Sequence, residues 1–158
     1  MSNNIRRAGV ILYAATDTGD VCFLLGIDAG SKNIASYTGH VEKIDKDVFH
    51  TASRELEEES LGCVNLTPER ISQGIIFCEK GTMISFVKVK IEEILEYISM
   101  FDACYKSIRR RPVKTEMCGT KLLIGDELVN CVENGRIYSV DAEVLKNNFV
   151  SLYARINT

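Results

Sequence analysis

The sequence predicts an α/β protein of the α+β type, in which helices pack against a mixed or largely antiparallel sheet. Three observations predict this class: strand-like segments occur in pairs joined by short turns, helical patterns alternate with those pairs, and no strand–helix–strand repeat is present. The 158 residues, 46% of them hydrophobic and 26% charged, are enough to bury a core. We therefore expect a single domain over 1–158.

The first half of the chain contains three predicted strands and a helix. β-forming residues fill 6–15 and 21–27 on either side of a polar turn, and a shorter strand follows at 34–41. An amphipathic helix is expected over 47–60. A second hairpin of 71–78 and 83–89 comes next.

The second half begins with a helix over 91–100, where apolar residues recur at helical spacing. Residues 106–121 are polar and basic and contain two helix-breaking residues, so they are expected to form a long functional loop. Further extended structure is expected over 122–132, and a last amphipathic helix over 139–156.

Composition excludes several classes of protein. No apolar run approaches the roughly 20 residues of a membrane span, and no signal-peptide pattern follows Met1, so we expect a cytoplasmic protein without a membrane partner. The six cysteines are scattered singly, which suggests neither a zinc site nor a disulfide framework. A net charge of −3 argues against extensive coating of nucleic acid.

The helix over 47–60 carries four glutamates within five positions, and like charges at this spacing repel. An acidic run is usually a solvated helix surface, and a helical wheel places Glu57 there. The same wheel places Glu55 and Glu59 on the face that should be buried, with Glu58 beside them. Buried carboxylates need a partner, and converging carboxylates suit Mg²⁺ or Mn²⁺, so this face is a candidate metal site.

The residues around these glutamates resemble the signature of the Nudix hydrolase family, G-x5-E-x7-R-E-U-x-E-E-x-G-U, where U is a bulky apolar residue. The resemblance covers the motif at 39–62 and, through strand order, extends loosely over 5–100. The matching residues are Gly39, Asp45 in place of the first Glu, Arg54, Glu55, Leu56, Glu58 and Glu59. The departures are Thr38 where many members have Gly, Asp45 itself, one extra residue before Arg54, and a Gly62 that comes one position late.

The resemblance implies an α/β/α sandwich with a mixed sheet and a loop–helix–loop catalytic motif. It assigns Mg²⁺ or Mn²⁺ to Glu55, Glu58, Glu59 and the backbone carbonyl of Gly39. Glu58 is favoured as the base that deprotonates the attacking water, with Glu55 as its rival, and Arg54 is expected to orient a carboxylate. Asp45 is expected to stabilise the loop.

Family members often use a further carboxylate from outside the motif. Glu116 is the first candidate for that role and Glu127 the second; the alternative for both is simple surface charge.

Substrate contacts are expected from basic residues. The segment 106–114 includes Arg109, Arg110 and Arg111, which would grip nucleotide phosphates or RNA unless the segment is only a solvated loop. Arg7, with Arg6 beside it, and His40 are further candidates for contacts with the substrate.

The leading functional hypothesis is a metal-dependent hydrolase that cleaves the pyrophosphate bond of a nucleoside diphosphate derivative by water attack. The derivative would be a nucleotide sugar, ADP-ribose, a dinucleotide or a noncanonical nucleoside triphosphate. One alternative is removal of the 5′ cap from RNA, with RNA as a partner of the basic loop. Another is a non-catalytic module that binds nucleotide. The oligomeric state, a homodimer included, is left open.

Overall fold

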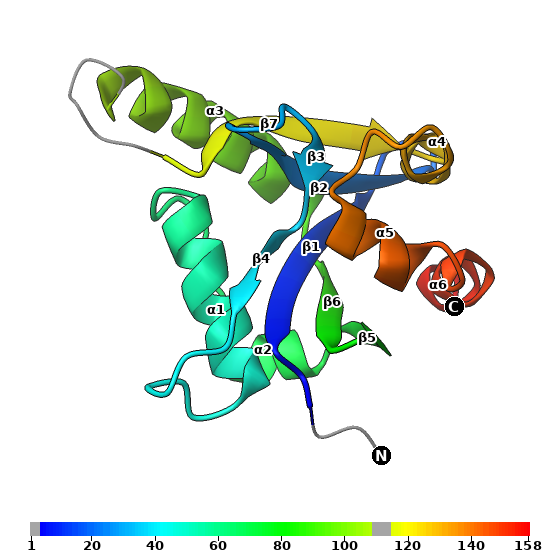
Figure 1. Ribbon diagram of the computed structural model, residues 1–158. Coiled ribbons are helices and arrows are strands. Elements are labelled where there is room, and N and C mark those ends of the chain that lie inside the picture. Colours follow the sequence, from blue (N-terminus) through cyan, green and yellow to red (C-terminus); the bar gives the residue numbers. More distant parts are fainter. Residues whose placement is uncertain (1–3, 109–114) are drawn as a thin grey trace.

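The computed structural model describes residues 4–108 and 115–158. In this part of the chain, helices cover a mixed sheet on both faces (Figure 1). Its strands are β1 (Arg7–Ala15), β2 (Val21–Asp28), β3 (Ile34–Ala35), β4 (Tyr37–His40), β5 (Ile75–Glu79), β6 (Thr82–Lys88) and β7 (Met117–Ile124). Its helices are α1 (Val48–Glu59), α2 (Pro68–Ser72), α3 (Ile91–Ile108), α4 (Glu127–Glu133), α5 (Ser139–Leu145) and α6 (Phe149–Ile156). Within the described ranges, no helix has both the length and the apolarity that a bilayer crossing requires.

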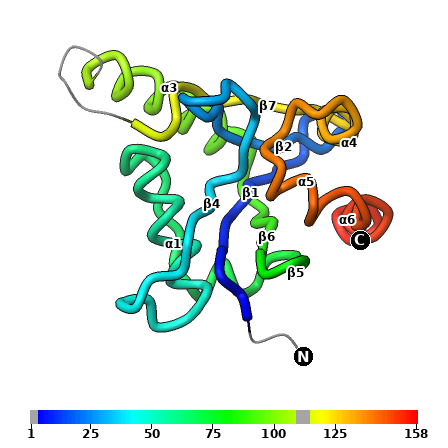
Figure 2. Tube along the Cα trace, in the orientation of Figure 1, coloured from blue at the N-terminus to red at the C-terminus, as the bar shows by residue number. Residues whose placement is uncertain are grey.

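Strand β1 organises the sheet. One edge of β1 pairs in parallel with β6, whereas its other edge pairs antiparallel with two strands in succession. Residues 7–10 pair with β4 and residues 12–15 pair with β2. Strand β5 adds beyond β6, while β3 and β7 both pair with β2. The change of partner along β1 leaves β4 beside the start of β1, next to α1 (Figure 2).

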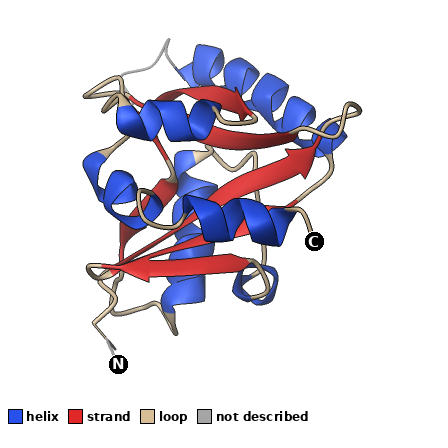
Figure 3. Cartoon of the chain, turned by 90° about the vertical axis from the view of Figure 1, so that its right-hand side faces the viewer, coloured by secondary structure: helices blue, strands red, loops and turns tan. Residues whose placement is uncertain are grey.

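The core lies on both faces of this sheet, because side chains of β1 alternate between them. Val10 and Leu12 pack in the cluster that α1, α2 and α3 cover, and Ile11 and Tyr13 pack in the cluster that α4, α5 and α6 cover. The view in Figure 3 shows helices on both sides of the strands. This layered arrangement confirms the predicted α+β class and the expected α/β/α sandwich.

The C-terminal third corrects the sequence prediction. The long loop expected over 106–121 is wrong at both of its ends, because α3 continues to Ile108 and β7 begins at Met117. The extended structure expected over 122–132 ends at Ile124, where a turn at Gly125 leads into α4. Strand β7 pairs only with β2 among the described strands, so it lies at an edge of the sheet. An edge strand carries fewer apolar residues than a central one, which makes its sequence look like a loop.

Two other elements also differ from prediction. The single helix expected over 139–156 is divided into α5 and α6. The strand expected over 71–78 begins only at Ile75, because α2 precedes it. Thr67 starts α2 by accepting a hydrogen bond from the amide of Arg70 on its hydroxyl, at 3.2 Å, and Pro68 fits the first helical turn.

A buried carboxyl group connects α5 to the segment between β3 and β4. Asp141, in the first turn of α5, is fully buried and accepts hydrogen bonds from the amide and the hydroxyl of Ser36, each at 2.7 Å. Burial raises the pKa of Asp141 to about 6, although the Ser36 hydrogen bonds and the charge of Arg7 oppose the rise. Asp141 therefore fixes the backbone that leads into β4.

This group should make stability depend on pH. The folded-state pKa of Asp141 lies above its ordinary value near 4, so the unfolded chain loses this proton first and the stability contribution is lost as pH rises through 6. We expect the Asp141 component of the unfolding free energy to fall by about 3 kcal/mol from below pH 4 to pH 7. Urea unfolding of the wild type and of Asp141→Asn across this pH range gives two profiles of unfolding free energy against pH, and their difference measures the Asp141 component. Asp102→Asn, which changes an exposed aspartate of α3, is the control. Parallel profiles for Asp141→Asn and the wild type would contradict the assignment.

Candidate functional site

Helix α1 carries the candidate acidic residues and is defined at both ends. At its start, the Asp47 carboxylate accepts a hydrogen bond from the amide of His50 at 2.9 Å. At its end, the amides of Leu61 and Gly62 bond back to the carbonyls of Glu58 and Glu57. This pattern is a Schellman motif, in which Leu61 takes the left-handed conformation (φ 58°) that glycine usually adopts. The late glycine of the sequence therefore changes the helix end but leaves α1 intact through Glu59.

The glutamates of α1 divide between the core and the solvent. Glu55 and Glu59 are each only 7% exposed, as the helical wheel predicts, and Glu57 is exposed. The Glu58 side chain is 59% exposed and lies 3.5 Å from the Arg54 guanidinium. Glu58 thus lies beside the buried pair and does not join it.

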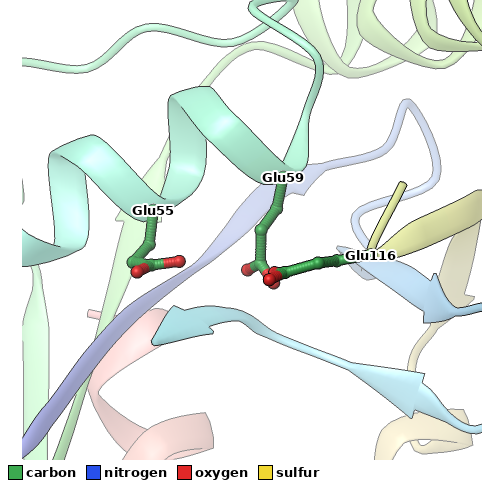
Figure 4. Close-up of side chains that lie close together, drawn as sticks. All are labelled: Glu55, Glu59 and Glu116. Atoms are coloured by element: carbon green, nitrogen blue, oxygen red, sulfur yellow. The ribbon is translucent and has the colours of Figure 1, made fainter. Parts of the chain in front are cut away.

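The buried pair meets a third carboxylate from a distant part of the chain. Carboxylate oxygens of Glu55, Glu59 and Glu116 lie within 4.8 Å of one another, and Figure 4 shows the three side chains directed toward a common region. Glu116 directly precedes β7. We call these three residues the carboxylate cluster. The structure brings together two residues of the motif with the first candidate for the auxiliary carboxylate.

The carboxylate cluster is electrostatically unfavourable without a cation. Burial, with the neighbouring carboxyl groups of Glu116 and Glu55, raises the pKa of Glu59 to about 10. Burial also raises the pKa of Glu55, against the opposing effect of Arg54. One buried oxygen of Glu59 has no hydrogen-bond partner among the described residues. A divalent cation would satisfy this oxygen and offset the repulsion, so the residues present fit Mg²⁺ or Mn²⁺.

Glycine at position 39 allows Glu55 to reach the cluster. A Cβ atom on Gly39 would lie 2.1 Å from the Glu55 carboxylate carbon and 2.2 Å from one of its oxygens. Real Cβ atoms do not approach other atoms so closely, so any residue other than glycine at position 39 would displace the Glu55 carboxylate. The structure thus gives a steric reason for glycine at the start of the motif.

Arg54 and Asp45 hold the loop before α1 against the cluster. The Arg54 guanidinium donates two hydrogen bonds to Asp45, at 2.9 and 3.0 Å, and a third to Glu55 at 2.9 Å. The hydrogen bonds from Arg54 to Asp45 are the main reason why the pKa of Asp45 lies well below its usual range. Asp45 also accepts hydrogen bonds from the hydroxyl of Thr51 and the amide of Glu42. Arg54 therefore links the loop to one carboxylate of the cluster, in a positioning role.

The cluster lies on a cavity of about 870 Å³ that is large enough for a nucleotide derivative. Arg7 and His40 line it, with a guanidinium nitrogen of Arg7 3.1 Å from the Nε2 atom of His40. Arg7 also donates a hydrogen bond to the Tyr138 hydroxyl at 3.3 Å and lies 5.8 Å from its ring centroid. Glu58 lines the same cavity. We call this space the cluster cavity.

Sequence reasoning missed Tyr138 and Asp28, which also line the cluster cavity. No motif surrounds either residue. Tyr138 reaches the cavity because its amide bonds to the carbonyl of Ile34, a contact between segments more than a hundred residues apart. Only tertiary structure could reveal it.

The remaining candidates lie elsewhere. Glu127 starts α4 and accepts a hydrogen bond from the amide of Ile124 at 2.6 Å. It lines a different cavity from the carboxylate cluster, so its position does not favour the role of auxiliary carboxylate. Arg6 lines a smaller cavity that adjoins Arg7 and His40. Arg109, Arg110 and Arg111 lie outside the described residues.

Comparison with known proteins identifies the fold. Neither a protein-family model nor a curated protein matches the sequence. Among solved structures, a mutT/nudix family protein from Listeria innocua matches 99% of this chain and 98% of its own, with a TM-score of 0.61 and 15% identity. A C. elegans Ap4A hydrolase in a binary complex matches 95% of this chain and 98% of its own, with a TM-score of 0.54 and 19% sequence identity. RenU, a Nudix hydrolase from M. smegmatis, matches 97% of this chain and 90% of its own, with a TM-score of 0.54 and 12% sequence identity. The chain has the Nudix fold.

Replacement of Gly39 tests the steric argument. We expect Gly39→Ala to displace the Glu55 carboxylate and to weaken Mn²⁺ binding about tenfold or more, as mutations that misplace metal ligands commonly do. Stability should change little, because the obstructing atoms belong to the flexible end of a side chain. Isothermal titration calorimetry with Mn²⁺ measures the affinity.

The matched control is Gly30→Ala, at another glycine of the cluster cavity. A Cβ atom there would meet only an oxygen of Asp28, at an ordinary 3.5 Å. Equal effects of the two substitutions on Mn²⁺ affinity would refute the role of Gly39.

Proposed function

We propose that this protein is a metal-dependent Nudix hydrolase, which cleaves the pyrophosphate bond of a nucleoside diphosphate derivative by water attack. The observation that carries the proposal is the convergence of Glu55, Glu59 and Glu116 on a large cavity that also presents Arg7. One buried oxygen of Glu59 has no hydrogen-bond partner in the part of the chain that the structure describes. Carboxylates for a cation and a guanidinium for phosphate are the groups that this chemistry requires. The Nudix fold of the chain supports the same reaction.

The ligand set follows from the cluster. Glu55, Glu59, Glu116 and the backbone carbonyl of Gly39 would hold one or more Mg²⁺ or Mn²⁺ ions. The ion would neutralise charge on the pyrophosphate and acidify a bound water. Arg54 keeps Glu55 in place through its hydrogen bond of 2.9 Å.

Glu58 is the proposed general base. It lines the cluster cavity, its side chain is 59% exposed, and it stands outside the three-carboxylate convergence, so it is free to accept a proton from water. Glu55 is less suited, because it is buried and accepts a hydrogen bond from Arg54 at 2.9 Å, whereas the same guanidinium comes no closer than 3.5 Å to the exposed Glu58. Arg7 and His40, on the wall of the same cavity, would bind substrate phosphates.

The substrate class is proposed from the cavity and from the neighbours. A cavity of about 870 Å³ accommodates a dinucleotide or a nucleotide sugar. Because one neighbour is named an Ap4A hydrolase, Ap4A heads the panel of substrates to test. Cap removal from RNA depends on the basic segment 106–114, of which 109–114 lie outside the described residues, and no described contact favours it.

A hydrolysis assay tests the proposal. The wild type is incubated with Ap4A, ADP-ribose, a nucleotide sugar, a noncanonical nucleoside triphosphate and capped RNA, each with Mg²⁺, Mn²⁺ or EDTA. We expect cleavage of at least one small nucleotide, absolute dependence on the cation, and incorporation of ¹⁸O from labelled water into a product phosphate. Glu59→Gln should lower kcat/KM about a hundredfold or more, whereas Glu57→Gln, the same change on the solvent face of α1, should not.

Two results would contradict the proposal: undiminished cleavage in EDTA, or an equal loss of kcat/KM in Glu59→Gln and Glu57→Gln. Tight nucleotide binding without cleavage of any substrate would instead identify a non-catalytic binding module.

Glu58→Gln separates the base from the metal ligands. We expect kcat to fall about a hundredfold, while the calorimetric affinity for Mn²⁺ stays near that of the wild type. Glu59→Gln should weaken Mn²⁺ binding as well. Loss of Mn²⁺ affinity in Glu58→Gln as severe as in Glu59→Gln would make Glu58 a ligand and leave Glu55 as the candidate base.

A further inference from the structure

A second cavity, of about 430 Å³, lies on the sheet face that α4 covers. Its buried floor is apolar and consists of Ile34 from β3, Leu123 from β7 and Cys131 from α4. It shares no lining residue with the cluster cavity. Its volume falls within the range of roughly 300–1,000 Å³ that is typical of small-molecule sites.

Three cations surround this cavity and come from three separate segments. Lys32 lies in the β2–β3 connection, Lys121 in β7, and Arg136 between α4 and α5. Among the described residues, none of the three lies within ion-pair distance of a carboxylate, whereas Arg54, Lys80 and Lys146 each do. The Lys32 ammonium donates a hydrogen bond to the Cys118 thiol, a weak acceptor, at 3.8 Å. Like charges gathered around one cavity repel one another, and an anion bound between them would relieve that repulsion.

The other polar groups of the rim suit a ligand that carries hydroxyl or amino groups. Glu127 accepts a hydrogen bond from the amide of Ile124 on one carboxylate oxygen, which leaves its second oxygen able to accept another. Asn33 and Asn130 add side-chain amides that both donate and accept. A bare inorganic anion would gain nothing from the apolar floor and would be repelled by Glu127.

We propose that this cavity binds a nucleoside monophosphate. The phosphate lies among Lys32, Lys121 and Arg136, where the Arg136 guanidinium offers a bidentate contact. The base lies on the apolar floor, and ribose hydroxyls or base amino groups donate to Glu127. One molecule thus satisfies the charged, polar and apolar parts of the cavity.

The site is independent of the proposed reaction. The β2–β3 connection and the segment around 136–138 separate the two cavities, since Asp28 and Tyr138 line the cluster cavity and Lys32 and Arg136 line the second one. Binding here requires no divalent cation. The proposal therefore goes beyond pyrophosphate hydrolysis and does not depend on it.

Calorimetric titration in EDTA tests this site, because the chelator removes any contribution of a metal at the carboxylate cluster. The probes are adenosine 5′-monophosphate, adenosine and inorganic phosphate. We expect saturable binding of the monophosphate, weaker binding of the other two, and a loss of affinity of about tenfold in both Lys121→Ala and Arg136→Ala.

Two control variants locate the site. Lys90→Ala removes an exposed cation before α3, and Arg7→Ala removes the guanidinium of the cluster cavity; both should bind the monophosphate as the wild type does. Thermal unfolding verifies that each variant folds. If the alanine variants do not fold, Arg136→Gln and Lys121→Gln, which remove the charge but keep more of the side chain, replace them.

Three results would overturn the proposal. They are no binding of the monophosphate in EDTA, binding that Arg7→Ala abolishes while Lys121→Ala and Arg136→Ala leave it intact, and inorganic phosphate binding as tightly as the monophosphate.

Discussion

The burial of Glu59 beside Glu55 is the constraint on which the rest of the site depends. Ionised carboxylates lose favourable hydration when they are buried, and three of them within a few ångströms also repel one another. The fold does not relieve this strain internally, since a buried oxygen of Glu59 lacks a partner in the described chain. Such an arrangement lowers stability without a cation and creates affinity for one. The unfavourable burial of these carboxyl groups on α1 is therefore the basis of the proposed cation site.

The neighbouring elements preserve this arrangement without neutralising it. Gly39 in β4 leaves room for the Glu55 carboxylate, and the split pairing of β1 places β4 next to α1. Arg54 could neutralise the cluster, but two of its hydrogen bonds go to Asp45 and only one to Glu55. Its charge is thus used mainly to fix the loop. The cluster keeps its three carboxyl groups available to a cation at the cavity, where Arg7 supplies positive charge for an anionic substrate.

The sequence predicted local features well, because local physics determines them. The periodicity of α1 alone distinguished the buried Glu55 and Glu59 from the solvated Glu57, and hairpin patterns identified β1 and β2. It failed where tertiary contacts decide. The first part of strand β7 looked like a loop because it forms at an edge of the sheet against β2. Tyr138 reaches the cluster cavity through the pairing of its backbone with Ile34. The second cavity draws its cations from three segments that share no motif, so no local pattern could predict it.

The most direct test of the account is whether a divalent cation reverses the stability order of the wild type and Glu59→Gln. In EDTA at neutral pH, Glu59→Gln should be at least as stable as the wild type, because it removes an ionisable group that burial disfavours. In Mn²⁺ the wild type should gain stability by linkage, as a protein that binds the ion only when folded must, and the variant should gain much less. Thermal unfolding of both proteins in both conditions provides the comparison. Equal stabilisation of the two by Mn²⁺, or a variant that is markedly less stable in EDTA, would contradict the claim that the carboxylate cluster is a cation site.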